Sequence, residues 1–251
     1  MGTLLGLHVL MVPGAARGTD VTEVLQRMAD ALETARDLRA SATFIIESEH
    51  GERIRWSAQY YRRSGPDGRM RLIFEDPIDL RGVDLTVRRR EDEVDEIRVY
   101  FPAIRRVRLL DADMRGESFL GTDFNYEDLG LEDLDFQKHT LLDDGEFEGE
   151  PCYRVRSVPA QSWFYGEIVR CIDKKSFLPR RTEYHSPAGQ HYKTRTLDVV
   201  ETIDEHTIPT RIAMRNLVSG TSTTIVYSDV ILNSGLKESI FVTTASVASG
   251  P

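Results

Sequence analysis

The sequence contains little cysteine and no long hydrophobic run. Its 251 residues include two cysteines, too few for a disulfide-rich scaffold or a cysteine-based zinc site. No stretch approaches the ~20 apolar residues that a membrane-spanning helix needs. The net charge of −9 argues against a nucleic-acid binder, because such proteins present a basic surface. The composition therefore favours a globular chain that folds on a hydrophobic core.

Signatures of the common enzyme classes are also missing. The chain has no G-x-S-x-G, no H-E-x-x-H, no P-loop and no dinucleotide-binding fingerprint. Its six histidines are scattered, and only His185 and His191 come near one another, on either side of a turn at Ser186–Gln190. Since we recognise no acid or cysteine at ligand spacing beside them, we expect no metal site, no other cofactor and no enzymatic activity.

The N-terminus resembles the end of a secretory signal. Leu4–Val12 is a short apolar run, and small residues follow it up to a cleavage point expected near Ala16. We therefore assign residues 1–18 to a signal-peptide remnant and residues 19–251 to a single domain. No linker rich in Gly, Ser or Pro divides this second part. An exported chain placed in the periplasm is the expectation.

One amphipathic helix is predicted near the N-terminus. Thr19 or Asp20 can cap it, and apolar residues recur on one face with the helical period as far as Ala35. The face that this helix would turn toward the rest of the protein includes Val24, Leu25, Met28 and Leu32.

From Ala40 onward the apolar period changes to two, which indicates β-strands. Turns rich in Gly, Pro or charge separate roughly eleven such strands, a spacing typical of an antiparallel meander. An open sheet of that size must curl, split or close. Its apolar face carries large residues at alternating positions: Phe44, Ile46, Trp56, Tyr60, Met70, Leu72, Phe74, Leu85 and Val99. From the residues alone, this face fits a packed core as well as it fits a hollow for acyl chains.

The two cysteines fall in a predicted hairpin. Pro151–Val158 and Gly166–Asp173 read as its strands, and a turn centred between Gln161 and Ser162 would place Cys152 opposite Cys171. Opposed residues at a non-hydrogen-bonded site lie close enough for a disulfide. A disulfide here is one expectation, and two free thiols are the other.

The segment Phe119-Leu-Gly-Thr-Asp-Phe-Asn-Tyr-Glu-Asp-Leu129 is the most distinctive in the chain. It resembles the F-x-G-[ST]-D-F-[ST]-Y-x-D-[IL] signature of outer-membrane lipoprotein-sorting proteins, a branch of the LolA/LolB-like superfamily. The block Tyr100-Phe-Pro-Ala-Ile-Arg-Arg-Val-Arg108 is similar to a second motif of that family. The motif residues to follow in the structure are Phe119, Gly121, Asp123, Phe124 and Tyr126.

Within the motif, Asp123 lies between Gly121 and Phe124. We expect its carboxylate either to cap the turn that starts at Asn125 or to pair with an arginine of Arg105–Arg108. A structural role is favoured over direct contact with a lipid headgroup.

The resemblance implies a mainly β fold with an N-terminal helix. Its antiparallel sheet would be strongly curved into an incomplete barrel, covered by the helix and loops. The implied function is that of a carrier, which binds acyl chains of a lipoprotein or lipid and transfers them toward the outer membrane. Its membrane contact would be peripheral and transient, and an inner-membrane transporter of the RND type is an implied partner. The alternative is a non-carrier accessory module of such a transporter, with a solid core and arginine-rich and acidic docking faces.

Overall fold

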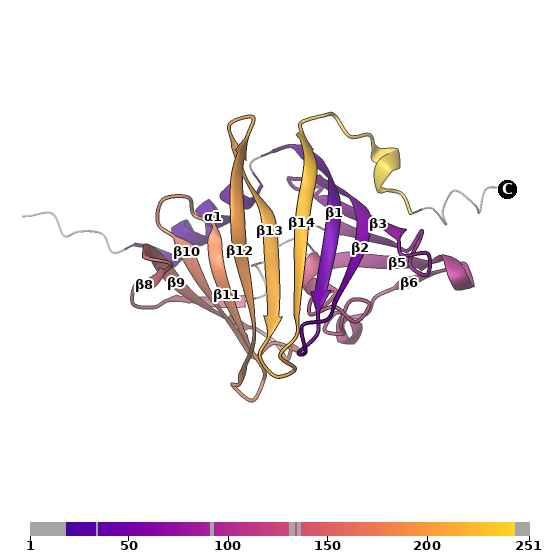
Figure 1. The fold of residues 1–251 in the computed structure, drawn as a ribbon. Helices are drawn as coiled ribbons and strands as arrows, with labels where there is room; N and C mark the ends of the chain where they lie inside the picture. Colours follow the sequence, from indigo (N-terminus) through magenta and orange to yellow (C-terminus); the bar gives the residue numbers. More distant parts are fainter. Residues whose placement is uncertain (1–18, 34, 91–92, 131–133, 135–136, 244–251) are drawn as a thin grey trace, which may run out of the picture.

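The computed structural model describes residues 19–33, 35–90, 93–130, 134 and 137–243. The predicted signal-peptide remnant at residues 1–18 lies outside this part of the chain. One α-helix, α1 (Val21–Leu32), precedes a 14-stranded antiparallel sheet (Figure 1). The strands are β1 (Asp37–Glu47), β2 (Arg53–Arg63), β3 (Arg69–Asp76), β4 (Asp84–Arg90), β5 (Glu93–Phe101), β6 (Arg106–Leu109), β7 (Gln137–Leu141), β8 (Gly145–Phe147), β9 (Glu150–Pro159), β10 (Glu167–Asp173), β11 (Pro179–His185), β12 (His191–Ile203), β13 (His206–Asn216) and β14 (Ser222–Leu232).

Helix α1 begins where its sequence predicts. The Asp20 carboxylate accepts a hydrogen bond from the backbone N–H of Thr22 at 3.1 Å, which satisfies a free donor of the first turn. The helix ends at Leu32, before the predicted Ala35, because Glu33 leaves the helical conformation with φ −112° and ψ 33°. Short 3-10 helices follow at η1 (Pro102–Ile104), η2 (Ala112–Met114), η3 (Glu127–Leu129) and η4 (Glu238–Phe241).

The sheet is built outward from β1. Strands β1 to β6 run as a meander to one edge, and the chain then crosses to β7 and returns through β9 to β14, which pairs with β1. The strand order is β6-β5-β4-β3-β2-β1-β14-β13-β12-β11-β10-β9-β7, with β8 beside β9. The prediction of a mainly β protein with an N-terminal helix and one antiparallel sheet is confirmed. The sheet is neither closed nor strongly curled, so the strong curvature that we expected is not seen.

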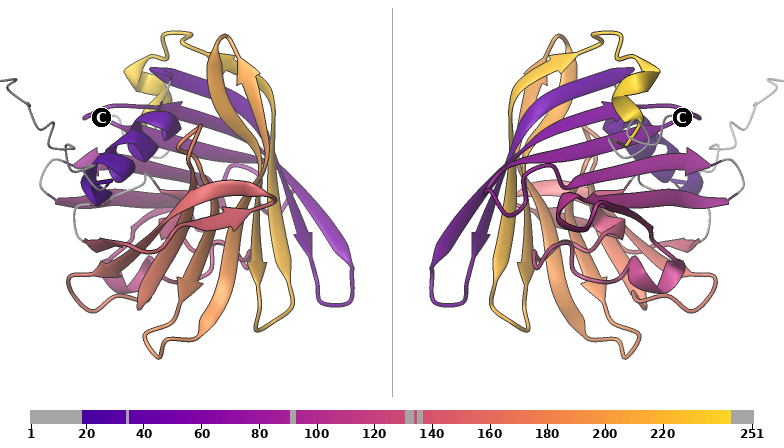
Figure 2. Two further views of the ribbon diagram at one scale, coloured as in Figure 1. Left: turned by 90° about the vertical axis from the view of Figure 1, so that its left-hand side faces the viewer. Right: turned by 90° about the vertical axis from the view of Figure 1, so that its right-hand side faces the viewer.

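One face of the sheet, which we call the inner face, carries Phe44, Tyr60, Leu72 and Ile225. Register places these residues side by side, because Phe44 lies opposite Ile225 on β14 and Tyr60 lies opposite Leu72 on β3. Helix α1 covers the β9–β10 part of the sheet, where Val24, Leu25 and Met28 form a buried cluster with Val155, Ile172 and Phe177. Figure 2 shows the helix lying to one side of the sheet.

The hairpin of β9 and β10 holds a disulfide between Cys152 and Cys171, whose Cα atoms are 5.4 Å apart. The predicted opposition of the two cysteines is wrong, because Cys152 lies opposite Asp173 and Cys171 opposite Arg154. This register centres the turn one residue later than predicted, between Ser162 and Trp163. The two cysteines therefore meet along a diagonal of the ladder.

Candidate ligand-binding cavity

A cavity of about 1640 Å³ lies against the inner face of the sheet. Its floor comes from β1, β2, β3, β12, β13 and β14. Its sides come from α1, the β2–β3 turn, the end of β4, parts of β5 and β11, and the second half of the family motif with the residues after it. Apolar side chains of the floor include Phe44, Leu72, Leu197, Ile212 and Ile225. The inner face thus contains a space large enough for a bulky apolar guest.

The structure divides the predicted cavity residues into two groups. Phe44, Tyr60 and Leu72 line the cavity. The other predicted residues belong to a packed cluster beside it, either fully buried or packed against its surface: Ile46, Trp56, Met70, Phe74, Leu85 and Val99. Phe44 and Leu72 are also members of that cluster, so the packed core and the cavity wall meet at these two residues.

The predicted lid helix divides in the same way. Of its four named residues, only Leu32 lines the cavity, together with Ala29 and Glu33. Val24, Leu25 and Met28 are buried against β9 and β10 instead. One side of α1 is thus an anchor, and the other side borders the hollow from Gln26 onward.

The family motif fills the packed part of the inner face. Phe119 is completely buried, and its ring lies 5.8 Å from that of Phe74 and 6.4 Å from that of Phe44. Tyr126 packs edge-on against Phe119 at 5.3 Å. Phe124 is buried as well and also borders the cavity. Gly121 adopts φ +84°, a conformation that glycine accepts without the steric cost of a side chain, and this reverses the chain between the buried rings.

Asp123 of the motif has neither of its predicted partners. Its two carboxylate oxygens accept hydrogen bonds from the hydroxyls of Thr221 at 2.5 Å and Thr223 at 2.7 Å. The backbone N–H of Asp123 also donates to Thr223 at 3.0 Å. The turn at Asn125 is capped by Asp128 instead, at 2.7 Å from the Asn125 backbone nitrogen. Asp123 therefore fixes the motif to the start of β14, a contact set by tertiary structure that local spacing could not indicate.

A second anchor is a buried ion pair that the sequence reading missed. The Lys193 Nζ lies 2.6 Å from Oδ2 of Asp128, and both side chains are 2% exposed. The rings of Tyr165, Tyr184 and Tyr192 surround the ammonium group with centroids at 5.0, 5.2 and 6.0 Å. Such rings attract a cation through the negative potential of their faces. The motif is thereby attached to β12 as well as to β14.

The electrostatics of this cluster follow from its burial. Burial lowers the pKa of Lys193, and the Asp128 carboxylate opposes that shift. Burial, together with the nearby Asp128 charge, raises the pKa of Tyr165 well above its ordinary value. Tyr165 therefore keeps its proton, and its hydroxyl donates a hydrogen bond to Oδ1 of Asp128 at 2.5 Å. The carboxylate is thus held by a hydroxyl, a backbone N–H and an ammonium group together.

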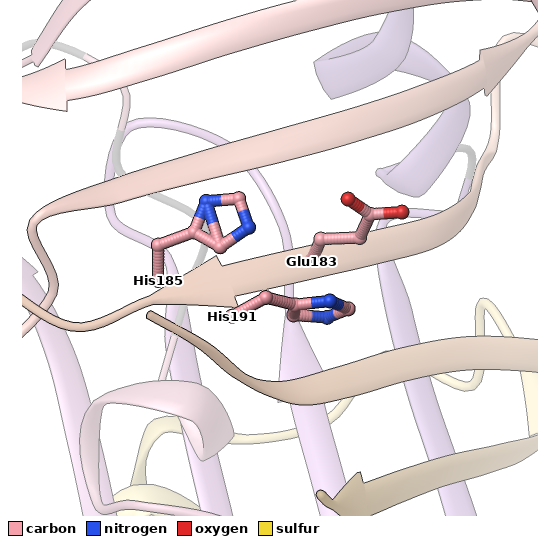
Figure 3. A group of neighbouring side chains, drawn as sticks. All are labelled: Glu183, His185 and His191. Atoms are coloured by element: carbon pink, nitrogen blue, oxygen red, sulfur yellow. The ribbon is translucent and has the colours of Figure 1, made fainter. Parts of the chain in front are cut away.

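A separate cluster lies at the end of the β11–β12 hairpin. Glu183, His185 and His191 each place a carboxylate oxygen or ring nitrogen within 4.8 Å of the others, as Figure 3 shows. The two imidazole rings are 5.1 Å apart and nearly perpendicular. Glu183, two residues before His185 on the same strand, is an acid that we did not recognise as a neighbour of the histidines. Glu183 and His185 lie on the face opposite the cavity, since they alternate with the buried Tyr184. His191 joins them because a register shift in the ladder places it opposite His185.

Residues 67–245 match the model of a family described as "Uncharacterized protein". The chain belongs to this family. A search of curated proteins found no match.

Two solved structures have closely similar folds. A DUF1329 family protein from Desulfovibrio piger has a TM-score of 0.81 at 23% identity, covering 90% of this chain and 98% of that one. A domain from Vibrio parahaemolyticus, provisionally named an outer membrane lipoprotein-sorting protein domain, has a TM-score of 0.82 at 24% identity, covering 87% and 94%.

A LolA superfamily protein from Nitrosomonas europaea also shares the fold. Its TM-score is 0.72 at 18% identity, over 90% of this chain and 98% of that one. These likenesses confirm the structural match to the LolA superfamily and to lipoprotein-sorting domains that the motif predicted. The chain therefore has a LolA-like fold, and the motif Phe119–Leu129 is the segment that crosses its inner face. Among the described residues, no helix is long and apolar enough to cross a membrane.

Proposed function

We propose that this LolA-like protein is a carrier that holds acyl chains of a lipid or lipoprotein in the cavity and passes them toward the outer membrane. The observation that carries the proposal is the hollow on the inner face. Its volume of about 1640 Å³ exceeds the roughly 300–1,000 Å³ of common small-molecule pockets. Binding and release need no covalent step, so the proposed role includes no enzymatic reaction.

The energetics suit such a guest. Each CH₂ group removed from water contributes about 0.8 kcal/mol, so two long acyl chains would supply well over 10 kcal/mol before the costs of association. The apolar floor around Leu72, Ile212 and Ile225 offers that surface. Charged residues at the rim of the same cavity, such as Arg62 and Arg88, can stay near the polar part of an amphiphile.

The periplasm is the proposed compartment. A disulfide such as Cys152–Cys171 forms and persists in oxidising compartments, including the bacterial periplasm. An acyl carrier there would meet the inner membrane, where the resemblance implies an RND-type transporter as a partner. Membrane contact would be peripheral and transient.

We propose that loading begins at the C-terminal end of α1 rather than by displacement of the whole helix. Glu33 joins this end to two other sides of the cavity. Its Oε1 lies 2.9 Å from Arg89 of β4, and its Oε2 accepts from the backbone N–H of Gly65 at 3.0 Å. Arg89 also donates to the Gly65 carbonyl at 3.1 Å. We call these contacts of Glu33 with Arg89 and Gly65 the latch. Because Val24, Leu25 and Met28 stay buried, the latch is the part of the lid that can open with a small loss of free energy.

Glu33→Gln should loosen the latch. The pair is about a quarter exposed, so we expect a stability loss of no more than about 1 kcal/mol. The rate at which a fluorescent fatty acid enters, followed by stopped-flow fluorescence, should increase because the closed state loses its charge pair. Glu23→Gln, on the exposed first turn of the same helix, is the matched control and should leave the rate unchanged. An unaltered entry rate in Glu33→Gln would show that the latch does not control access.

Native mass spectrometry of the purified protein tests the proposed function directly. We expect bound lipid or acylated peptide, released on denaturation and identified in the organic extract. A protein that carries nothing and gives no response to fatty-acid probes would favour the accessory-module alternative.

The accessory-module alternative has an observation of its own. Strand β6 pairs only with β5 among the described strands, and it exposes Val107 and Leu109 beside Arg106 and Arg108. An exposed strand edge can add a strand from a partner. In that case a charged substitution at Val107 would abolish partner capture while lipid content stayed at zero. The carrier proposal expects the purified protein to contain lipid, and it expects a charged substitution at Val107 to leave that lipid content unchanged.

A further inference from the structure

We propose that Glu183, His185 and His191 bind a divalent transition-metal ion on the sheet face opposite the cavity. Register carries the first step of the argument. Glu183 and His185 are two residues apart on β11 and so point to the same side, while His191 of β12 lies opposite His185. Three atoms able to ligate a metal therefore converge from two paired strands (Figure 3).

The backbone holds the two histidines in place. They flank a closed turn in which Ser186 and Gln190 share a backbone hydrogen bond of 2.9 Å and the Gly189 N–H donates to the Ser186 carbonyl at 2.8 Å. Bonds of about 2.0–2.2 Å to zinc place tetrahedral ligand atoms roughly 3.4 Å apart. Since the three atoms already lie within 4.8 Å, small side-chain rotations bring them onto one ion.

Hydrogen bonds around the rings leave one nitrogen of each histidine for a metal. Glu167 of β10 accepts from Nδ1 of His185 at 2.9 Å, and because a carboxylate only accepts, the proton sits on Nδ1. The lone pair of the neutral ring is then on Nε2. His191 contacts the Thr194 hydroxyl through Nε2 at 2.9 Å, which leaves Nδ1. A carboxylate behind a metal-binding histidine is the usual orienting partner.

The donor set indicates the class of ion. Two imidazoles and one carboxylate suit zinc and its neighbours in the first transition row, whereas calcium and magnesium prefer oxygen ligands alone. One oxygen of Glu183 contacts Arg181 at 2.9 Å, so the other remains for the ion. Three protein ligands leave a fourth position for water or for a donor atom from another molecule.

Titration of the metal-free full-length chain with zinc, followed by calorimetry, tests the proposal. We expect one ion per chain and a higher thermal unfolding midpoint when zinc is present. Cobalt in place of zinc should give the visible absorption of a tetrahedral site. Binding should weaken as the pH falls, because a metal-bound imidazole must be deprotonated.

Substitutions locate the ion. His185→Gln and His191→Gln should each abolish the cobalt spectrum, and Glu167→Gln should weaken binding by about 10–100-fold, the effect usual for an orienting partner. His50→Gln is the matched control, since His50 is an exposed histidine on a distant turn. Circular dichroism confirms that each variant is folded. Absence of stoichiometric binding, or binding that persists unchanged in His185→Gln/His191→Gln, would overturn the proposal.

Discussion

Replacing Lys193 by methionine should destabilise the protein by about 3–5 kcal/mol, because removal of one partner leaves the other charge buried without compensation. Asp128 would keep its hydrogen bonds from Tyr165 and from the Asn125 backbone. It would lose the Lys193 ammonium group, which lies 2.6 Å from its Oδ2. Urea denaturation monitored by circular dichroism measures the free energy of unfolding. The wild type and the variant should have equal m-values if only stability changes.

A double-mutant cycle isolates this pair. Lys193→Met combined with Asp128→Asn should recover most of the lost stability, because the buried site then contains no net charge. The amide oxygen can accept from the Asn125 N–H while its NH2 group donates to the Tyr165 hydroxyl. Lys175→Met is the matched control. It breaks a pair with Glu150 in which the side chains are 75% and 56% exposed, so screening by water should leave the free energy of unfolding nearly unchanged. Equal losses in Lys193→Met and Lys175→Met would show that burial of the first pair is energetically unimportant.

Much of the fold could be predicted from the sequence because its determinants are local. The cap at Asp20 and the helical period that follows it specify α1. Alternation of apolar and polar residues specifies the strands, and their turns carry glycine, proline or charge. The end of α1 was missed by a few residues because Ala35, although apolar and buried, belongs to a different cluster with Leu38 and Ile208. Apolar periodicity alone cannot tell a helical residue from the first buried residue after it.

The location of the hollow could not be predicted, because it depends on where a distant segment comes to rest. Leu72 and Phe74 are two residues apart on β3 and lie on the same face of the sheet. Phe74 is nevertheless covered by Phe119 of the motif, whereas Leu72 borders the cavity. Nothing near either residue encodes that difference. The same holds for Lys193, whose partner Asp128 is 65 residues away in the sequence.

The grouping of Glu183 with His185 and His191 could have been predicted from the sequence, unlike the location of the hollow. Glu183 and His185 are two residues apart in a predicted strand, and this spacing alone places them on one face. Applying strand periodicity to the polar residues, as well as to the apolar ones, would have brought Glu183 next to the histidine pair. Strand periodicity is therefore sufficient to predict this cluster.

Ile212→Glu should reduce the affinity for a fluorescent fatty acid by about 100-fold or more. Ile212 lines the cavity on β13, opposite Ile225 of β14, so a carboxylate there must lose water when acyl chains enter. The desolvation of an uncompensated ion costs several kcal/mol, and every ~1.4 kcal/mol is a factor of ten in affinity. Equilibrium fluorescence titration measures the change. Trp56 and Phe74, which alternation alone would have suggested for this test, do not line the cavity, so a charge there would not test the hollow directly.

Ile231→Glu on β14 is the matched control for the same substitution. Ile231 is 42% exposed and lies opposite Arg39, on the face away from the cavity, so binding should be unchanged. Ile212→Trp separates loss of space from addition of charge. It keeps the wall apolar but occupies part of the hollow, so it should lower the amount of bound acyl chain without the full loss of affinity. Wild-type binding in a folded Ile212→Glu variant would mean that the hollow beside β13 is not where the acyl chains lie, and the carrier proposal would lose its central observation.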